Sequence, residues 1–368
     1  MIGVTGTDGK TTTVNMIYQI LKSVGKKVSM ISTINAVIGG KNMDTGFHVT
    51  SPDSFLVQKL IKQAREKGTE VLVFEVTSHA LDQFRFWGIK WDIGVITNIT
   101  HEHLDYHRTW TNYFNTKSKL IKNVRVAVLN RDENHFSRLI SVPHPMCKAI
   151  SFGLSKRAAF NPQNFPFKLK IPGEFNVLNG LAAAAVASSL GIDKKIIKQT
   201  LGSFQSLPGR MEDVVNKKGL RIVIDFAHTP NGLEQALKTL RSHMSSGKLV
   251  SLIGCEGSRD VKKRPMMGEI AQKLSDVVIV TAVDSRGQIK EINKQIKKGS
   301  LKAGAKSGQN FYIIEDRQKA IKFAINQLSQ NGDTIGIFGK GHEKSMNLDG
   351  KMEIPWSDRE AIEKALHG

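Results

Sequence analysis

The chain has 368 residues, of which 40% are hydrophobic and 23% are charged. This length and composition predict a globular protein of two or three domains and exclude a low-complexity or repeat protein. The longest apolar stretch, residues 181–187, is too short to cross a bilayer, and the N-terminus does not resemble a signal peptide. We therefore expect a cytoplasmic protein with no membrane partner.

The formal net charge is +20, from 53 Lys and Arg residues against 33 Asp and Glu residues. Such a balance is typical of proteins that bind nucleic acid, an acidic surface or polyanionic small substrates. The lysines are scattered through predicted helices without interleaved aromatic residues, so we expect no nucleic-acid partner. Cys147 and Cys255 lack the spacing of a metal site or a disulfide framework, which fits a reducing compartment.

The chain opens with a glycine-punctuated turn between a predicted strand and a predicted helix. The β-branched run at residues 2–5 predicts a buried strand, and residues 14–24 are compatible with a helix. Gly6 and Gly9 allow the backbone between them to turn tightly, so that its N–H groups face phosphate oxygens near a helix N-terminus. The order of strand, loop and helix therefore predicts a phosphate-binding loop.

Two side chains of this turn suit a nucleotide triphosphate with magnesium. Lys10 would reach the β- and γ-phosphates, and the Thr11 hydroxyl would hold Mg²⁺. The strict phosphate-loop pattern has a glycine where this chain has Val4, so the motif is a variant. The alternative is an ordinary helix N-terminus with a chance Gly-Lys-Thr sequence.

Two further segments of the first half place polar groups near strand or helix ends. Thr50 or Ser51 precedes a predicted helix at residues 54–67, where it would either bind an anionic group or simply cap the helix. Glu75 ends a predicted strand at residues 70–76, at the sheet edge that the phosphate loop shares. A carboxylate there is placed to bind Mg²⁺, the alternative being an acid with only a structural role.

A dense polar segment follows the next predicted strand, at residues 93–98. Residues 101–107 contain three histidines and two acids, but their spacing is not one typical of zinc sites, so we expect at most one histidine at a magnesium or phosphate site. In the predicted helix at residues 110–121, Lys117 shares a face with Tyr113 and should be half buried. Spacing alone assigns Lys117 no role.

The second half of the chain alternates strands and helices from residue 221 to residue 338. We predict an α/β protein: a P-loop-type, mostly parallel sheet domain at residues 1–206, followed by a Rossmann-like doubly wound α/β domain at residues 207–368. The polar loops after the strands of the second domain should share one edge of its sheet: residues 225–230, 254–264, 283–286 and 339–343.

Seven segments then resemble one family, in order along the chain. They are GTDGKTT (6–12), EVTSHAL (75–81), NITHEHLDYH (98–107), NYFNTKSKL (112–120), GRME (209–212), DFAHTPNGL (225–233) and GKGHE (339–343). The chain resembles the Mur ligases, and among them the branch that adds a diamino acid. The resemblance implies an ATP-dependent amide ligase of peptidoglycan precursor synthesis. It would phosphorylate the D-glutamate side-chain carboxylate of UDP-MurNAc-L-Ala-D-Glu, and the diamino acid's amine would then displace phosphate.

The resemblance also implies roles for individual residues. ATP would be bound by Gly6, Thr7, Asp8, Gly9, Lys10, Thr11, Thr12, Asn179, Arg210 and Asp225. Thr11 and Glu75 would serve one Mg²⁺, His103 would belong to a second metal site, and Lys117, if carbamylated, would become a metal ligand. The catalytic group would be Lys10, Lys117, His103 and Glu75. The UDP-linked substrate would contact Thr50, Ser51, Thr77, Gln83 and Arg85. The incoming amino acid would contact Arg259, Asp284, Arg286, Gly339 and Glu343.

Three departures from the family pattern affect substrate recognition. The phosphate loop starts at the beginning of this sequence, so we expect the family's N-terminal uridine-binding domain to be missing. Either the sequence is a fragment, or the enzyme binds its substrate with less surface, or the substrate differs. The family's Asp-Asn-Pro-Arg loop is Val-Asp-Ser-Arg at residues 283–286, and its Gly-Gly-Asp-Arg-Asp is Glu-Gly-Ser-Arg-Asp at residues 256–260. Because Arg259 and Arg286 remain, we favour meso-diaminopimelate over L-lysine as the amino acid.

Two alternatives stay open from the sequence. A folylpolyglutamate-synthase-like ligase also lacks a uridine-binding domain, although the SHAL, HTP and GKGHE segments are typical of the muramoyl branch. A catalytically silent nucleotide-binding module is the other, and salt-sensitive DNA binding would support it. We expect small-molecule partners only, and relatives suggest a monomer.

Overall fold

The structure is a computed structural model that describes residues 1–43 and 52–367, and it divides into two units. Unit 1 comprises Met1–Thr100 and His107–Gln205, and unit 2 comprises His101–Tyr106 and the chain from Ser206 onward. Among the described residues, every helix is too short or too polar to cross a bilayer.

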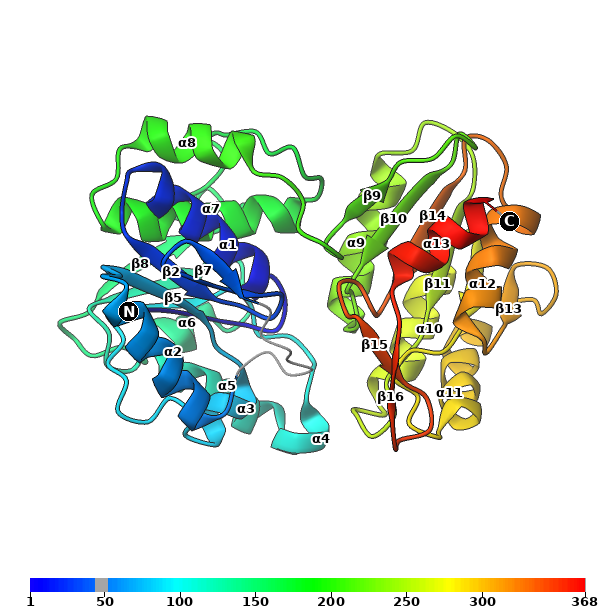
Figure 1. Ribbon diagram of the computed structural model, residues 1–368, viewed down its shortest axis with the longest axis horizontal. Helices are drawn as coiled ribbons and strands as arrows, with labels where there is room; N and C mark the ends of the chain where they lie inside the picture. The colour runs from blue at the N-terminus through cyan, green and yellow to red at the C-terminus, as the bar shows by residue number, and fades with distance from the viewer. Residues whose placement is uncertain (44–51, 368) are drawn as a thin grey trace. The chain divides into compact units, whose positions relative to one another are not determined.

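Unit 1 is built on an eight-stranded sheet in the order β4-β3-β2-β5-β1-β6-β7-β8 (Figure 1). The six strands from β2 to β8 in this order are parallel, whereas β3 and β4 join the edge as an antiparallel hairpin. The strands are β1 (Ile2–Thr5), β2 (Val28–Ile31), β3 (Ala36–Ile38), β4 (Lys41–Met43), β5 (Val71–Glu75), β6 (Ile93–Ile96), β7 (Val126–Asn130) and β8 (Lys148–Phe152).

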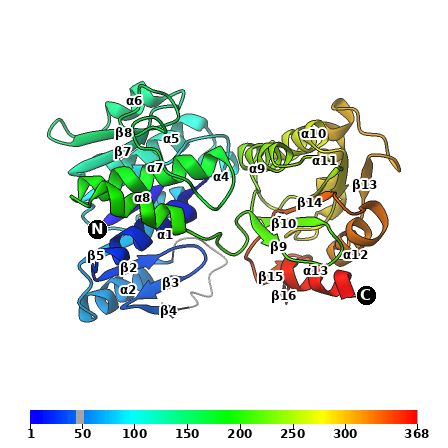
Figure 2. The same cartoon turned by 90° about the horizontal axis from the view of Figure 1, so that it is seen from above.

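Helices cover both faces of this sheet, with α1, α7 and α8 on one side and α2, α3 and α5 on the other (Figures 1 and 2). The small residues of α7 allow it to lie close to α1, and all of its alanines are buried. The helices are α1 (Lys10–Ser23), α2 (Ser54–Glu66), α3 (Ser78–Asp82), α4 (Leu104–His107), α5 (Trp110–Ser118), the 3₁₀ turn η1 (Lys119–Ile121), α6 (Phe136–Ile140), α7 (Glu174–Ser189) and α8 (Lys194–Ser203).

Unit 2 contains a six-stranded sheet in the order β13-β12-β11-β14-β10-β9, in which only β9 is antiparallel to its neighbour. Its strands are β9 (Glu212–Val214), β10 (Arg221–Asp225), β11 (Leu249–Ile253), β12 (Val277–Val280), β13 (Phe311–Ile313) and β14 (Thr334–Phe338). A separate hairpin joins β15 (Ser345–Asn347) and β16 (Glu353–Pro355). The helices are α9 (Pro230–Ser242), α10 (Lys263–Leu274), α11 (Ile289–Lys302), α12 (Arg317–Phe323), the π-helical turn η2 (Ala324–Leu328) and α13 (Asp358–His367).

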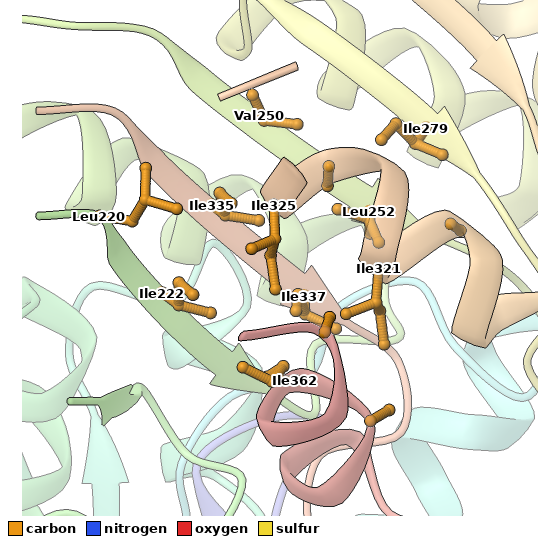
Figure 3. Close-up of a cluster of buried hydrophobic side chains, with 14 of the residues drawn as sticks. Leu220, Ile222, Val250, Leu252, Ile279, Ile321, Ile325, Ile335, Ile337 and Ile362 are labelled. Atoms are coloured by element: carbon orange, nitrogen blue, oxygen red, sulfur yellow. The ribbon is translucent and has the colours of Figure 1, made fainter. Parts of the chain in front are cut away.

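One hydrophobic core of unit 2 lies between its sheet and the helices α12 and α13 (Figure 3). Ile321 and Ile362 from these helices pack on Leu252 and Ile337 of the central strands. Central strands of a parallel sheet are buried on both faces, which explains why every residue of β11 and β14 is buried and most are apolar.

The predicted fold class is confirmed, and most predicted elements lie within a few residues of the observed ones. One boundary error of four residues concerns α1, which begins at Lys10 rather than at residue 14. The segment predicted as one helix at residues 110–121 consists of the α-helix α5 followed by the 3₁₀ turn η1. The sequence analysis missed the short strands β3, β4, β9, β15 and β16, because three-residue strands are too short to show alternation.

Candidate active site

The glycine-rich turn between β1 and α1 has the geometry of a phosphate-binding loop. Gly9 caps α1 in the left-handed region, at φ 82°, and its missing Cβ would lie 2.2 Å from the Asn179 Oδ1 atom. A Cβ on Gly6 would lie 1.8 Å from the Thr97 Oγ1 atom. Only glycine fits at these two positions, so the turn brings the N-terminus of α1 and its partial positive charge to the sheet edge.

Residues at the end of the neighbouring strand β6 hold this turn in shape. The Asn98 Oδ1 atom accepts hydrogen bonds from the backbone N–H groups of Thr7 (3.2 Å) and Asp8 (2.8 Å), and the Asn98 side-chain amide donates to the Asp8 carbonyl. The Thr97 hydroxyl donates to the same carbonyl at 2.7 Å. Sequence analysis did not single out Thr97 or Asn98, although both directly follow the strand that pairs with β1.

Thr11 and Glu75 are brought together, as the predicted magnesium site requires. The Thr11 hydroxyl donates a 2.9 Å hydrogen bond to Glu75 Oε2, and both side chains are buried. The Thr33 backbone N–H donates to the same oxygen at 2.9 Å. Hydroxyl and carboxylate oxygens are the ligands that Mg²⁺ prefers, so these two residues fit the ion. Lys10 bends back over the turn and donates to the Thr7 carbonyl at 2.9 Å.

Lys117 lies deep beneath the same turn. Its side chain is 2% exposed, so the prediction of half burial was wrong. The Nζ atom donates a 2.6 Å hydrogen bond to the Gly6 carbonyl and lies 4.7 Å from the centre of the Tyr113 ring. The Tyr113 hydroxyl in turn lies 3.0 Å from the Thr7 hydroxyl, so α5 supplies two side chains that contact the turn.

The remaining unit 1 positions divide into contacts of the turn and contacts around α3. Asn179 on α7 accepts a 3.3 Å hydrogen bond from the Thr13 hydroxyl. Thr77 caps α3 by accepting from the Ala80 N–H, and the Arg85 Nε atom donates to Gln83 at 2.9 Å. The other two positions expected to contact the UDP-linked substrate, Thr50 and Ser51, lie outside the described residues.

His103 belongs to the short segment of unit 2 that follows β6 in the chain. Its backbone is left-handed, at φ 55°, and its Nδ1 atom lies 3.8 Å from Glu102 Oε1. Glu102 also accepts a 3.0 Å hydrogen bond from the buried ammonium group of Lys263. Within residues 1–43 and 52–367, no group of three or more His, Cys, Asp or Glu side chains could hold a metal ion.

Two of the positions expected to bind ATP, Arg210 and Asp225, lie close together in unit 2. Both Asp225 carboxylate oxygens accept backbone hydrogen bonds, from Met211 at 2.7 Å and from Ala227 at 2.8 Å. The Arg210 guanidinium group lies 4.4 Å from the centre of the Phe226 ring. Asp225 therefore fixes the turn that carries Arg210.

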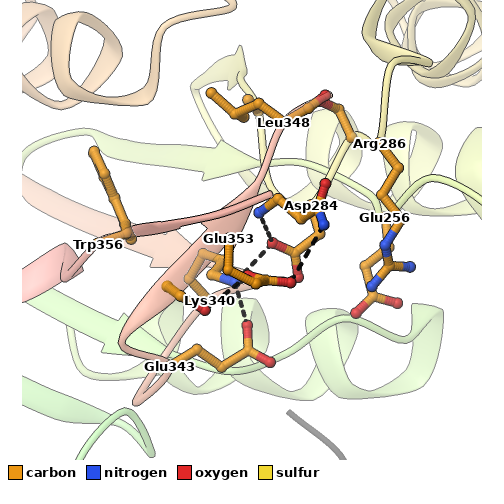
Figure 4. Close-up of polar contacts among 12 residues, drawn as sticks. Glu256, Asp284, Arg286, Lys340, Glu343, Leu348, Glu353 and Trp356 are labelled. Atoms are coloured by element: carbon orange, nitrogen blue, oxygen red, sulfur yellow. Dashed lines mark hydrogen bonds and ion pairs between the residues drawn. The ribbon is translucent and has the colours of Figure 1, made fainter. Parts of the chain in front are cut away.

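Two of the positions expected to contact the amino acid share a buried cation (Figure 4). The Lys340 Nζ atom lies 3.0 and 3.2 Å from the two Asp284 oxygens and 2.5 Å from Glu343 Oε2. Burial raises the pKa of Glu343 to about 7, although Lys340 acts to lower it. Burial alone would lower the pKa of Lys340, but the two carboxylates outweigh it and raise the pKa. Sequence analysis assigned no role to Lys340, although it lies within the GKGHE segment.

Arg259 and Arg286, the other charged positions of this group, lie near Glu256. The Arg259 Nε atom is 3.7 Å from Glu256 Oε2. Arg286 has a left-handed backbone, at φ 46°, and donates from its guanidinium group to the Gly257 carbonyl at 3.0 Å. Gly339, at φ 104°, starts the loop that carries Lys340.

Comparisons with known proteins agree on one family. The Mur ligase middle domain matches residues 4–187, and the Mur ligase glutamate ligase domain matches residues 209–341. The 2,6-diaminopimelate ligases of Clostridium acetobutylicum and Aquifex aeolicus, which act on UDP-N-acetylmuramoyl-L-alanyl-D-glutamate by name, are each 36% identical to the chain. The alignments cover 100% of this chain and 78% and 77% of those relatives.

Solved structures give the same result. A UDP-N-acetylmuramoyl-L-alanyl-D-glutamate–2,6-diaminopimelate ligase is 30% identical with a TM-score of 0.63, over 100% of this chain and 78% of that one. Folylpolyglutamate synthase of Mycobacterium tuberculosis, at 17% identity and a TM-score of 0.65 over 92% of this chain and 88% of that one, shares the fold alone. The prediction of an enzyme is confirmed: the chain belongs to the Mur ligase family of ATP-dependent amide ligases.

Proposed function

We propose that the chain joins meso-diaminopimelate to the D-glutamate of UDP-MurNAc-L-Ala-D-Glu. The observation that carries this proposal is that unit 1 contains the glycine-rich turn with its Thr11–Glu75 contact, while unit 2 contains Arg259 and Arg286 on the loops that follow β11 and β12. The names of relatives that are 36% identical support the same substrates. We assign residues 1–206 to a central ATP-binding domain and residues 207–368 to a C-terminal domain.

The first half of the reaction makes an acyl phosphate. An oxygen of the D-glutamate side chain attacks the γ-phosphorus of ATP, and ADP leaves. The Lys10 ammonium group and the N-terminus of α1 stabilise the negative charge on the transferred phosphoryl group. Thr11 and Glu75 would hold Mg²⁺, which supplies further charge neutralisation when bound. Lys117, if carbamylated, would be a metal ligand, and His103 would belong to a second metal site.

The second half forms the amide bond. The uncharged amine of the diamino acid attacks the acyl carbon, and inorganic phosphate leaves with the bonding electron pair. The amine must lose its proton before or during this attack. Asp284 and Glu343 are acids that would stabilise the ammonium group as the amino acid binds, and Lys340 fixes both of them.

The test is phosphate release by the full chain with ATP, Mg²⁺ and UDP-MurNAc-L-Ala-D-Glu. Parallel reactions contain meso-diaminopimelate, L-lysine or no amino acid, and a Lys10→Met variant is the control for contaminating phosphatase. Release that depends on diaminopimelate and is absent from the variant supports the proposal. Release only with L-lysine, or none with either amino acid, contradicts it.

A further inference from the structure

Helix α11 of unit 2, which lies beside α10 in Figures 1 and 2, has one face packed against the protein and one face of lysines. On the packed face, Ile296 and Gly299 lie directly against the backbone of α10. The opposite face recurs at helical spacing, and we call it the lysine face: Lys290, Lys294, Lys297, Lys298 and, among them, Leu301. Three of these lysines are exposed and Lys297 is half-buried, while Leu301 is 52% exposed.

The positive charges of the lysine face are not balanced within the protein. Elsewhere in unit 2, exposed lysines pair with an acid one turn away, as Lys238 does with Glu234 on α9 and Lys273 with Glu269 on α10. Within residues 1–43 and 52–367, none of the four ammonium groups of the lysine face forms an ion pair. The single acid of α11, Glu291, instead accepts a 2.7 Å hydrogen bond from the Gln295 side chain.

The spacing of these charges favours an extended anionic surface over a small anion. Lys290 and Lys298 are eight residues apart, which places them about 12 Å from each other along the helix axis. A single phosphate or carboxylate group is too small to contact lysines at both ends of this row. A surface that carries many negative charges contacts all four lysines at once, and the net charge of +20 attracts it from a distance.

The side chains of the lysine face fit lipid headgroups better than nucleic acid. The face contains neither an arginine, which binds phosphate with two hydrogen bonds, nor an aromatic ring on which a base could stack. It does contain Leu301, an exposed apolar side chain surrounded by lysines. A bilayer accepts an apolar side chain between its headgroups, whereas the phosphate backbone of a duplex offers no apolar contact there.

We propose that the lysine face of α11 binds the anionic surface of a lipid bilayer. The lysines contact the headgroups, and Leu301 enters the boundary between the headgroups and the acyl chains. This contact requires no membrane-spanning helix, and it departs from the expectation of no membrane partner that the sequence gives. It goes beyond the proposed function and does not depend on it.

The experiment is co-sedimentation of the full chain with vesicles, without ATP or amino acid. One set of vesicles contains equal parts of phosphatidylcholine and phosphatidylglycerol, and the other contains phosphatidylcholine alone. A lysine near an anionic membrane contributes about 5-fold to the partition coefficient, so four lysines should contribute on the order of 100-fold after screening by salt. We expect wild type to bind only the anionic vesicles and high salt to release it.

Two variants with the same charge separate the lysine face from the net charge. The first replaces all four lysines of the face: Lys290→Gln, Lys294→Gln, Lys297→Gln and Lys298→Gln. The second replaces four exposed lysines on α2, α8 and α12: Lys59→Gln, Lys194→Gln, Lys195→Gln and Lys322→Gln. The first variant should lose on the order of 100-fold in binding, and the second should lose much less. Circular dichroism checks that both variants are folded.

A second pair of variants tests the apolar contact without changing the charge. Leu301→Ser should weaken vesicle binding by roughly 3- to 10-fold, because the side chain no longer enters the bilayer. Leu190→Ser removes a leucine of similar exposure, 44%, at the end of α7 and should leave binding unchanged.

The outcomes decide the inference whether or not every variant folds. If wild type does not bind anionic vesicles, the inference is wrong. If the two four-lysine variants lose equally, net charge alone causes binding and the inference is again wrong. If wild type binds duplex DNA more tightly than vesicles and Leu301→Ser changes neither, the partner is nucleic acid rather than a membrane. A loss confined to the lysine face and to Leu301 supports the inference.

Discussion

Replacing Lys340 by methionine should destabilise unit 2 in a way that depends on pH. The substitution keeps a long apolar side chain but removes the cation that Asp284 and Glu343 share. Breaking a buried ion pair by removing one partner costs about 3–5 kcal/mol in the free energy of unfolding. The full cost applies only where the Glu343 carboxyl is ionised.

The pH dependence follows from Glu343. In wild type its pKa is raised to about 7 from a usual value of 4.5, so its effect on stability is most favourable below pH 4.5 and is lost as the pH rises through 7. Without Lys340 the pKa of Glu343 rises further. Stability of Lys340→Met then continues to fall above pH 7, by about 1.4 kcal/mol per pH unit, while wild type levels off. The loss should be about 2–3 kcal/mol larger at pH 9 than at pH 6.

Urea unfolding of the full chain, followed by circular dichroism at both pH values, measures this difference. The double variant Lys340→Met/Glu343→Gln is the matched control, because it leaves only one carboxylate and should recover stability at pH 9. An equal loss at both pH values, or a double variant no more stable than the single one at pH 9, would refute the reasoning.

Three further predictions concern other contacts. Asp358→Asn leaves the buried Arg317 guanidinium group without its bidentate partner, so unfolding by urea should show a loss of about 3–5 kcal/mol, whereas Asp213→Asn at a surface pair should show little change. Gly209→Ala places a Cβ 2.2 Å from the His342 backbone nitrogen at φ 64°, so thermal unfolding should occur at a lower temperature and the KM for ATP should rise. Thr11→Val removes the hydroxyl that contacts Glu75, so titration with Mg²⁺ in the presence of ATP should need roughly 10-fold more metal for half-maximal activity, and an unchanged requirement would exclude Thr11 as a ligand.

Much of the fold was predictable because buried parallel strands have a strong signal. β5, β10 and β12 contain uninterrupted apolar runs, at residues 71–74, 222–224 and 277–280, and each run is bounded by polar residues. The start of α1 was placed too late, because three consecutive threonines are poor helix formers in isolation. The backbone of the turn, with Gly9 as the left-handed cap, overrides that local preference.

The sequence was enough to predict which edge of the sheet carries the candidate site, but not which side chains contact one another there. Glycine spacing and strand ends were enough to place Lys10, Thr11 and Glu75 at one edge of the first sheet. They did not indicate the burial of Lys117, because burial on that face depends on how closely α5 approaches the Gly6 carbonyl. Nor did they indicate Asn98, whose role depends on its side-chain amide contacting the turn with both the oxygen, which accepts, and the nitrogen, which donates.

The pairing of Asp284 with Lys340 shows why such contacts cannot be inferred from strand ends alone. Asp284 follows β12 and Lys340 follows β14, and β11 lies between these strands. The two backbones therefore leave the sheet about 10 Å apart, twice the strand spacing, which a long lysine side chain can bridge. Space for the bridge comes from Gly254, at the end of β11, where a Cβ would lie 2.6 Å from a Val283 methyl group. A Cβ on Gly339 would also lie 3.1 Å from Val283, so the loops after β12 and β14 contact each other beyond the C-terminal end of β11. The ion pair thus depends on two glycines and one valine that carry no charge, and no pattern of charged residues in the sequence would indicate it.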